Sequence, residues 1–376
     1  MSKQNTLFAP DWALPPGESI LDLVQERGWT QAELSKRLGY TEKHMSQLVN
    51  GKVTLTVDAA QRLERVLGSS IDFWLALEAN YHKHKSRLEA AQRHAAWVPW
   101  LDQLPLKDLM RCKAIPEQRL DSKNKPSLVE ACLRFFGVAT PEEWRMHYGN
   151  MQGAFRRSRA ERSDVGAISA WLRLGEKQAE TFDWHHYDKD RFEEALGRIR
   201  CLTSESPDVF GPQMRKLLHE AGVLFILVPA ISRAHVSGVA RWLNLTRPMI
   251  QLSLYGKTND KFWFSFFHEA AHILLHSKNK KEKKSIFLED ISATGVEIDD
   301  GCEREANEWA GNHLIPFNYS QELANLKTKD AVIDFAGRVG IHCGIVVGRL
   351  QHDKLIDPSW MNTLKQKFQF KESYVP

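Results

Sequence analysis

The stretch that decides the fold is FFHEAAHILLH, residues 266–276, in which two histidines lie four residues apart with a glutamate between them. Residues four apart share one face of an α-helix, so His268 and His272 can present their imidazoles to one metal ion. Glu269 falls on the neighbouring flank, where it can hold a water molecule at the metal and take its proton. The apolar surroundings make three buried polar residues costly without partners. The pattern predicts a buried helix with a zinc site of the peptidase type.

A catalytic zinc ion (Zn2+) takes three protein ligands and leaves one position for water, so a third ligand is needed. His276 follows His268 by eight residues, which is about 12 Å along a helix axis and too far for two ligands of one ion. We therefore expect His276 in the core or beside a ligand. The third ligand has to come from another segment.

The segment GCEREANEWAGNHLIP, residues 301–316, predicts a second helix that brings a carboxylate to this site. Its inward face is marked by Cys302, Ala306, Trp309, Ala310 and His313. At 100° per residue, Glu303 lies about 60° from Ala306, whereas Glu305 lies about 100° away on the other flank. The projection favours Glu303 as the third ligand.

Together, HEAAHILLH (268–276) and EREANEWAGNHLIP (303–316) resemble the ImmA/IrrE family of zinc metallopeptidases. The resemblance covers roughly residues 212–351 and implies a zincin-like α+β fold with His268, His272 and Glu303 as zinc ligands. It also implies Glu269 as the general base. Trp309 stands where the family usually has phenylalanine, and AGNHLIP departs mildly from an alanine-rich end. Neither departure changes a ligand.

Peptide hydrolysis also needs a hydrogen-bond donor for the oxyanion that develops on the scissile carbonyl. Tyr255 and His313 are the candidates, and the sequence does not decide between them. The strands expected before the helix, VLFILVP (223–229) and ARWLNLTRPMIQLSL (240–254), would supply the edge on which an extended protein substrate lies.

Near the N-terminus, TQAELSKRLGYTEKHMSQLVNGK (30–52) has the spacing of a helix-turn-helix, with Gly39 at the bend. Thr30 and Glu33 form a capping box, and Thr41, Thr56 and Ser70 can cap three further helices. The fifth helix is expected over IDFWLALEANYHKHK, residues 71–85. The core of the motif is expected to contain Ala32, Leu34, Leu38, Met45 and Leu48.

The second helix of the motif predicts a DNA-reading surface. Glutamine, lysine and glutamate near a helix start can pair with adenine, guanine and cytosine edges in the major groove, and flanking polar groups can reach phosphates. The predicted contacts are Gln31, Thr41, Glu42, Lys43, His44, Gln47, Asn50 and Lys52. The alternative is a helical bundle used for protein contact, because residues 1–96 carry only twelve basic against eleven acidic residues.

This region resembles the Xre/Cro/CI class of helix-turn-helix domains. The longer run from LPPGESILDLVQERGWTQAEL to FWLALEANY is similar to HigA-type antitoxins. That resemblance implies binding to operator DNA as a homodimer. It also implies autoregulation of a toxin–antitoxin system with a HigB-like ribonuclease toxin as partner.

With 376 residues, the chain is too long for one ordinary core. We expect a multidomain protein: an all-α helix-turn-helix DNA-binding domain over 1–96, a helical connecting region over 97–207 and an α+β metallopeptidase domain over 208–376. The net charge of +4 and the pI near 8.7 permit a polyanionic partner without requiring one. Five scattered cysteines indicate neither disulfides nor a cysteine-bound metal. No signal or membrane span is evident, so a cytoplasmic location and no membrane partner are expected.

Three functions remain open. The first is a DNA-binding transcriptional regulator and antitoxin whose zinc endopeptidase cleaves a protein partner: a repressor, the toxin or the chain itself. The second is an antitoxin that binds operator DNA and a toxin and carries a structural or sensory zinc. The third is a peptidase whose N-terminal helices recruit its substrate. The presence of Glu269 argues against the second, because a site without catalysis needs no base.

Overall fold

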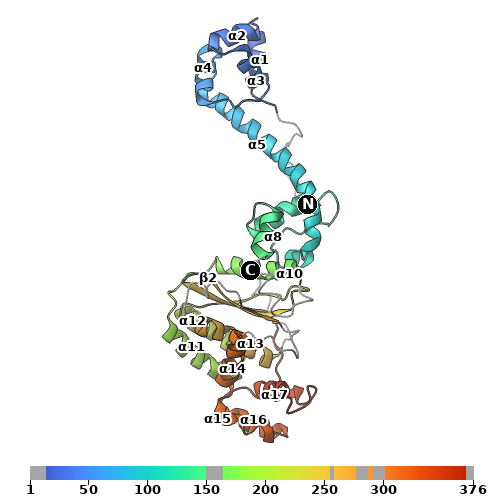
Figure 1. The fold of residues 1–376 in the computed structure, drawn as a ribbon, viewed down its shortest axis with the longest axis vertical. Coiled ribbons are helices and arrows are strands. Elements are labelled where there is room, and N and C mark those ends of the chain that lie inside the picture. Colours follow the sequence, from blue (N-terminus) through green and yellow to red (C-terminus); the bar gives the residue numbers. More distant parts are fainter. Residues whose placement is uncertain (1–13, 150–163, 255–257, 277–286, 291–300, 370–376) are drawn as a thin grey trace. The chain divides into compact units, whose positions relative to one another are not determined.

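The computed structural model describes residues 14–149, 164–254, 258–276, 287–290 and 301–369 (Figure 1). Contacts divide the chain into two compact units, one ending at Val98 and the other beginning at Pro99. The basic stretch at 154–163 and the lysine-rich stretch at 277–284 lie outside the described residues.

The first unit contains five helices: α1 (Gly17–Glu26), α2 (Gln31–Leu38), α3 (Glu42–Val49), α4 (Val57–Leu67) and α5 (Ile71–Ala96). The hydroxyl oxygens of Thr30, Thr41, Thr56 and Ser70 each accept the backbone N–H three residues on, as the sequence predicts. Gly39 ends α2 in the left-handed conformation, with φ of 72°. The bend of the helix-turn-helix therefore sits at a residue without a Cβ penalty.

Hydrophobic side chains from all five helices form the core of this unit. Leu34, Leu38, Met45 and Leu48 are buried as expected, whereas Ala32 is only partly buried. The carboxylate of Glu33 accepts from Arg37. α5 continues to Ala96, well past the predicted end.

The second unit begins with helices. They are η1 (Val98–Gln103), α6 (Leu106–Arg111), α7 (Lys125–Phe136), α8 (Pro141–Gly149), α10 (Val165–Ala179), α11 (Lys189–Cys201), η2 (Leu202–Ser204) and α12 (Pro207–Glu220). After the sheet come α13 (Asn259–Leu275), α14 (Gly301–Leu314), α15 (Phe317–Ser320), η4 (Leu323–Asn325), α16 (Lys329–Val339), α17 (Cys343–His352) and η5 (Asn362–Leu364). No single helix in the described ranges is long and apolar enough to cross a membrane. The bent pair α16 and α17 together has the length and composition of a span.

Four strands form one mixed sheet in the order β1-β3-β2-β4. They are β1 (Leu224–Leu227), β2 (Val236–Asn244), β3 (Arg247–Leu252) and β4 (Phe287–Asp290). β1 runs parallel to β3, and β2 runs antiparallel to β3 and β4. The hairpin turn lies between Asn244 and Arg247. β2 therefore begins earlier than the sequence indicates, and β4 has no counterpart among the predicted strands.

Alternate residues of the sheet face two different layers. Ala240, Ile250 and Leu252 belong to the large hydrophobic core that contains α13. On the other face, Arg241 donates to the carbonyl of Leu172 at 2.9 Å and pairs with Glu176 at 2.8 Å. α10 thus covers the face opposite α13 (Figure 1).

A second polar contact fastens α10 to the sheet. The Gln251 amide donates to the carbonyl of Trp171 at 2.7 Å, and a Cβ at Gly175 would lie 2.0 Å from the Gln251 side-chain oxygen. The segment expected only to connect two domains therefore contributes a layer to the unit that holds the sheet. The functional boundary at residue 207 stays a prediction.

Candidate metal centre and DNA-binding surface

Helix α13 presents its polar residues inside the core. His268, Glu269 and His272 are exposed by only 1 %, 0 % and 2 %. The large apolar side chains on the other sides of α13, Trp263 and Phe267 among them, are also buried and hold the helix in place. The packing of α13 therefore holds all three polar groups inside the protein.

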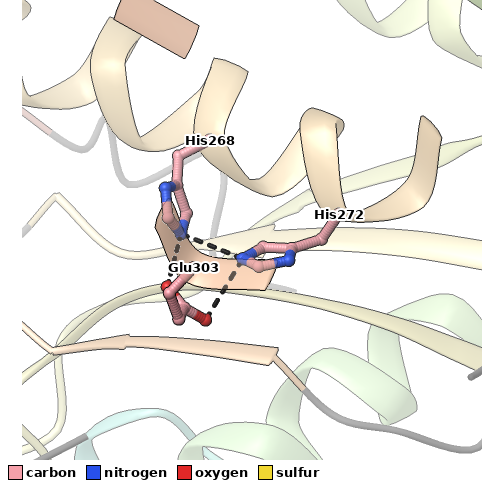
Figure 2. Close-up of side chains that lie close together, drawn as sticks. All are labelled: His268, His272 and Glu303. Atoms are coloured by element: carbon pink, nitrogen blue, oxygen red, sulfur yellow. Dashed lines mark hydrogen bonds and ion pairs between the residues drawn. The ribbon is translucent and has the colours of Figure 1, made fainter. Parts of the chain in front are cut away.

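Three donor atoms converge between α13 and α14 (Figure 2). The Nε2 atoms of His268 and His272 lie 3.0 Å apart. Glu303 places Oε2 3.2 Å from the first nitrogen and Oε1 3.3 Å from the second. Tetrahedral bonds of about 2.0–2.1 Å to one zinc ion would separate two donors by about 3.3 Å, so the spacing fits such an ion. Among the described residues, these three form the one cluster suited to a metal.

Hydrogen bonds on the outer sides of the rings turn two lone pairs toward the centre. His268 Nδ1 lies 3.0 Å from Asn307 Oδ1, an oxygen that only accepts. His272 Nδ1 lies 3.1 Å from Nδ1 of His276, whose Nε2 lies 3.0 Å from the Glu305 carboxylate. Because the carboxylate accepts, a neutral His276 accepts in turn from the Nδ1–H of His272. With a metal ion bound, neutral rings at 268 and 272 would carry their protons outward and aim unprotonated Nε2 atoms at one point.

The ionisation states suit a cation at that point. Burial lowers the pKa of His272 to about 4, against the opposing effect of its hydrogen bond with Glu303. Burial raises the pKa of Glu303, but its contacts with the two rings outweigh that effect and set the pKa well below its ordinary value. At neutral pH the site therefore offers a neutral imidazole at His272 and an ionised carboxylate, which is the form metal ligands require.

The two glutamates that were compared as third ligand, of which the projection favours Glu303, lie at different places. Glu303 reaches the histidine nitrogens, while Glu305 reaches His276. Asn307 was not singled out from the sequence. It could have been, because it follows Glu303 by four residues and so lies on the same helix face.

Of the two suggested oxyanion donors, only His313 lies among the described residues, and its geometry does not support that role. The His313 ring stacks on Trp309 at 4.6 Å and lies 4.8 Å from Phe267, and its Nε2 faces the carbonyl of Leu196. It also follows Glu303 by ten residues, about 15 Å along the helix. Tyr255 lies outside the described residues.

In the first unit, most of the predicted DNA contacts are open to solvent. Thr41, Glu42, Lys43, Asn50 and Lys52 are exposed, and Gln31, His44 and Gln47 are partly exposed. The Thr41 hydroxyl accepts from His44 N–H, and the Asn50 amide donates to the Ser46 carbonyl, so both have local structural roles. The His44 ring packs edge-on against Tyr40, with centroids 4.6 Å apart. The base contacts expected for Glu42, Lys43 and Gln47 stay predictions.

Comparison with known families separates the same two regions. Residues 20–74 match the family model described as helix-turn-helix, and residues 219–351 match a peptidase family described as the IrrE N-terminal-like domain. A search of curated proteins found no match. The fold and the matches define a class of protein with a helix-turn-helix domain followed by a metallopeptidase-type domain. More particularly, the first region is similar to helix-turn-helix domains of the Xre/Cro/CI type and the second to IrrE-like domains.

Proposed function

We propose that this protein is a transcriptional regulator that binds operator DNA through α2 and α3 and hydrolyses a peptide bond in a protein partner with a zinc ion. The convergence of His268, His272 and Glu303, with the buried Glu269 on the same helix, carries the proposal. A structural zinc site usually has four protein ligands, whereas three ligands leave a position for water. The described residues supply three.

The roles of the residues follow from their positions. The Nε2 atoms of His268 and His272 and the Glu303 carboxylate would hold the ion. When bound, zinc supplies a Lewis acid that polarises the scissile carbonyl and lowers the pKa of water. Glu269 takes a proton from the attacking water and delivers it to the leaving amine. His276 with Glu305, and Asn307, keep the two ligand rings turned toward the ion.

The sheet offers a place for an extended substrate. In the described part of the sheet, β4 is an edge strand and runs antiparallel to β2. An edge strand can pair with an added peptide through main-chain hydrogen bonds. Binding of this kind suits a protein substrate whose cleaved segment becomes extended, and the candidates are a repressor, the toxin or the chain itself.

On the DNA side, we propose a homodimer on a palindromic operator, as helix-turn-helix proteins generally bind. A HigB-like toxin remains a proposed partner. The alternative function is an antitoxin that binds DNA and toxin while its zinc is structural or sensory. The three-donor geometry and the adjacent Glu269 favour catalysis over that alternative.

Cleavage is tested by incubating zinc-loaded wild type and Glu269→Gln with the product of the adjacent gene and following both proteins by mass spectrometry. We expect the partner, or the chain itself, to be cut only by the wild type. Equal cutting by Glu269→Gln would refute the mechanism, and zinc binding without cutting would favour the antitoxin alternative. A footprint on the operator tests the DNA role, and its absence would leave a peptidase with a recruiting module.

A further inference from the structure

Gly238 lies where a glycine is otherwise unfavourable. It sits inside β2 and pairs with Leu252 of β3 on one side and with Glu289 of β4 on the other. Glycine weakens a strand interior because it loses more conformational freedom on folding and offers no side chain to pack. Its φ is not in the left-handed region, so backbone conformation does not demand it. Another requirement must account for it.

The space beside Gly238 is occupied by Glu269. A Cβ at position 238 would lie 2.7 Å from Glu269 Oε1 and 2.9 Å from its Cγ. Both distances are shorter than any ordinary contact of a Cβ atom. The same Cβ would lie 2.7 Å from the end of the Leu252 side chain, which can rotate away. Glu269 has less freedom, because it is fully buried on a helix packed against the sheet.

We propose that Gly238 is a positioning residue for catalysis: its missing side chain lets β2 approach α13 closely enough to fix the Glu269 carboxylate beside the metal ligands. The inference rests on the proposed role of Glu269 as general base. Any side chain at 238 would push the carboxylate off its place while leaving His268, His272 and Glu303 untouched. Proton transfer would then suffer and metal binding would not.

The first test is kinetic and uses zinc-loaded full-length Gly238→Ala. A displacement on the order of 1 Å can cost about 100-fold in rate, so we expect kcat to fall by about that factor. KM and zinc content should stay unchanged, because the atoms nearest to a Cβ at position 238 belong to Glu269 and Leu252 and not to a proposed zinc ligand. Gly197→Ala on α11 is the matched control, since a Cβ there meets nothing within 4 Å. Wild-type kcat in Gly238→Ala would overturn the proposal.

The second test needs no metal and no substrate, and it separates this proposal from the proposed function. We expect Gly238→Ala to lower the Tm of the metal-free protein by several degrees, because the new methyl group meets Glu269. In a Glu269→Ala background the same change should be neutral or stabilising. An equal Tm loss in both backgrounds would mean that the new methyl group clashes with Leu252 and not with Glu269, and would refute the inference. If the wild type itself cleaves nothing, the proposed function fails while this double-mutant cycle still reports on the contact.

Discussion

Zinc affinity should depend on His276, although this residue lies too far along α13 to bind the ion itself. Its Nδ1 lies 3.1 Å from the Nδ1 of His272, and its Nε2 lies 3.0 Å from the Glu305 carboxylate. His276→Leu puts an apolar side chain of similar size in place of the imidazole and removes the acceptor. His272 would then lose the contact that keeps its proton on the outer nitrogen, and its ring would gain freedom to turn.

The expected size follows from the hydrogen bonds involved. A bond between neutral groups contributes about 0.5–1.5 kcal/mol, and one to a charged group about 1.5–3 kcal/mol. The chain from His272 to Glu305 contains one of each. Part of their loss already affects the metal-free protein, so only a fraction appears as lost affinity. We expect zinc to bind about 10–100-fold more weakly, which corresponds to about 1.4–2.7 kcal/mol.

Competition with a chromophoric chelator at constant pH measures this change directly. His276→Asn is the matched control, because its side-chain oxygen can take the place of Nδ1 and accept from His272; we expect most of the affinity to return. Glu305→Gln should have an intermediate effect, since it keeps an acceptor but removes the charge. An affinity of His276→Leu within twofold of wild type would refute the reasoning.

Three further changes test other parts of the structure. Gln47→Ala should weaken operator binding by roughly 1–3 kcal/mol in a gel-shift titration, and unchanged binding would remove it from the reading surface. Glu176 is paired with the buried Arg241; burial raises the pKa of Glu176, but Arg241 and Arg173 together lower it below its ordinary 4.5. A pKa that is lower in the folded state gives stability that is present above pH 4.5 and is lost as the pH falls through the folded-state pKa. The Tm of wild type should therefore fall in acid, and the Tm of Glu176→Gln should fall less steeply. Parallel curves would contradict this. Met45 is fully buried, so Met45→Ala should lower the free energy of unfolding, measured in urea, by about 2–5 kcal/mol. A loss under about 1 kcal/mol, which is what a volume-conserving substitution costs, would contradict this and show that neighbouring side chains fill the gap.

Local signals in the sequence were strong enough to predict most helices. Threonines 30, 41 and 56 cap helices as expected because the capping hydroxyl acts within three residues. The predicted end of α5 was wrong. No glycine or proline stands between Lys85 and Ala96, and the residues there favour helix, so α5 continues to Ala96.

The strands were less predictable because pairing is not local. β2 starts at Val236, in a segment with no clear alternation, and its length is decided by partners on both sides. β4 is four residues long and was not predicted. Its existence depends on β2, and nothing near Phe287 indicates that.

In the candidate site, too, local features could be predicted from the sequence and contacts between distant segments could not. Helical periodicity puts Glu303 rather than Glu305 toward the histidines, and their distances agree with that projection. Spacing places Asn307 on the same helix face as Glu303, but its contact with His268 and that of Gly238 with Glu269 join elements about thirty or more residues apart, so spacing alone does not reveal these two contacts.

The proposed function depends most directly on a zinc ion held by Glu303 and the two histidines. Metal content should therefore be measured by elemental mass spectrometry on wild type, Glu303→Ala and Glu305→Ala after loading and dialysis. The two variants change like residues on one helix, and only the first removes a proposed ligand. We expect one zinc per chain in wild type, a reduced but measurable amount in Glu305→Ala and none in Glu303→Ala. Full zinc in Glu303→Ala, or none in the wild type, would contradict the proposed metal centre.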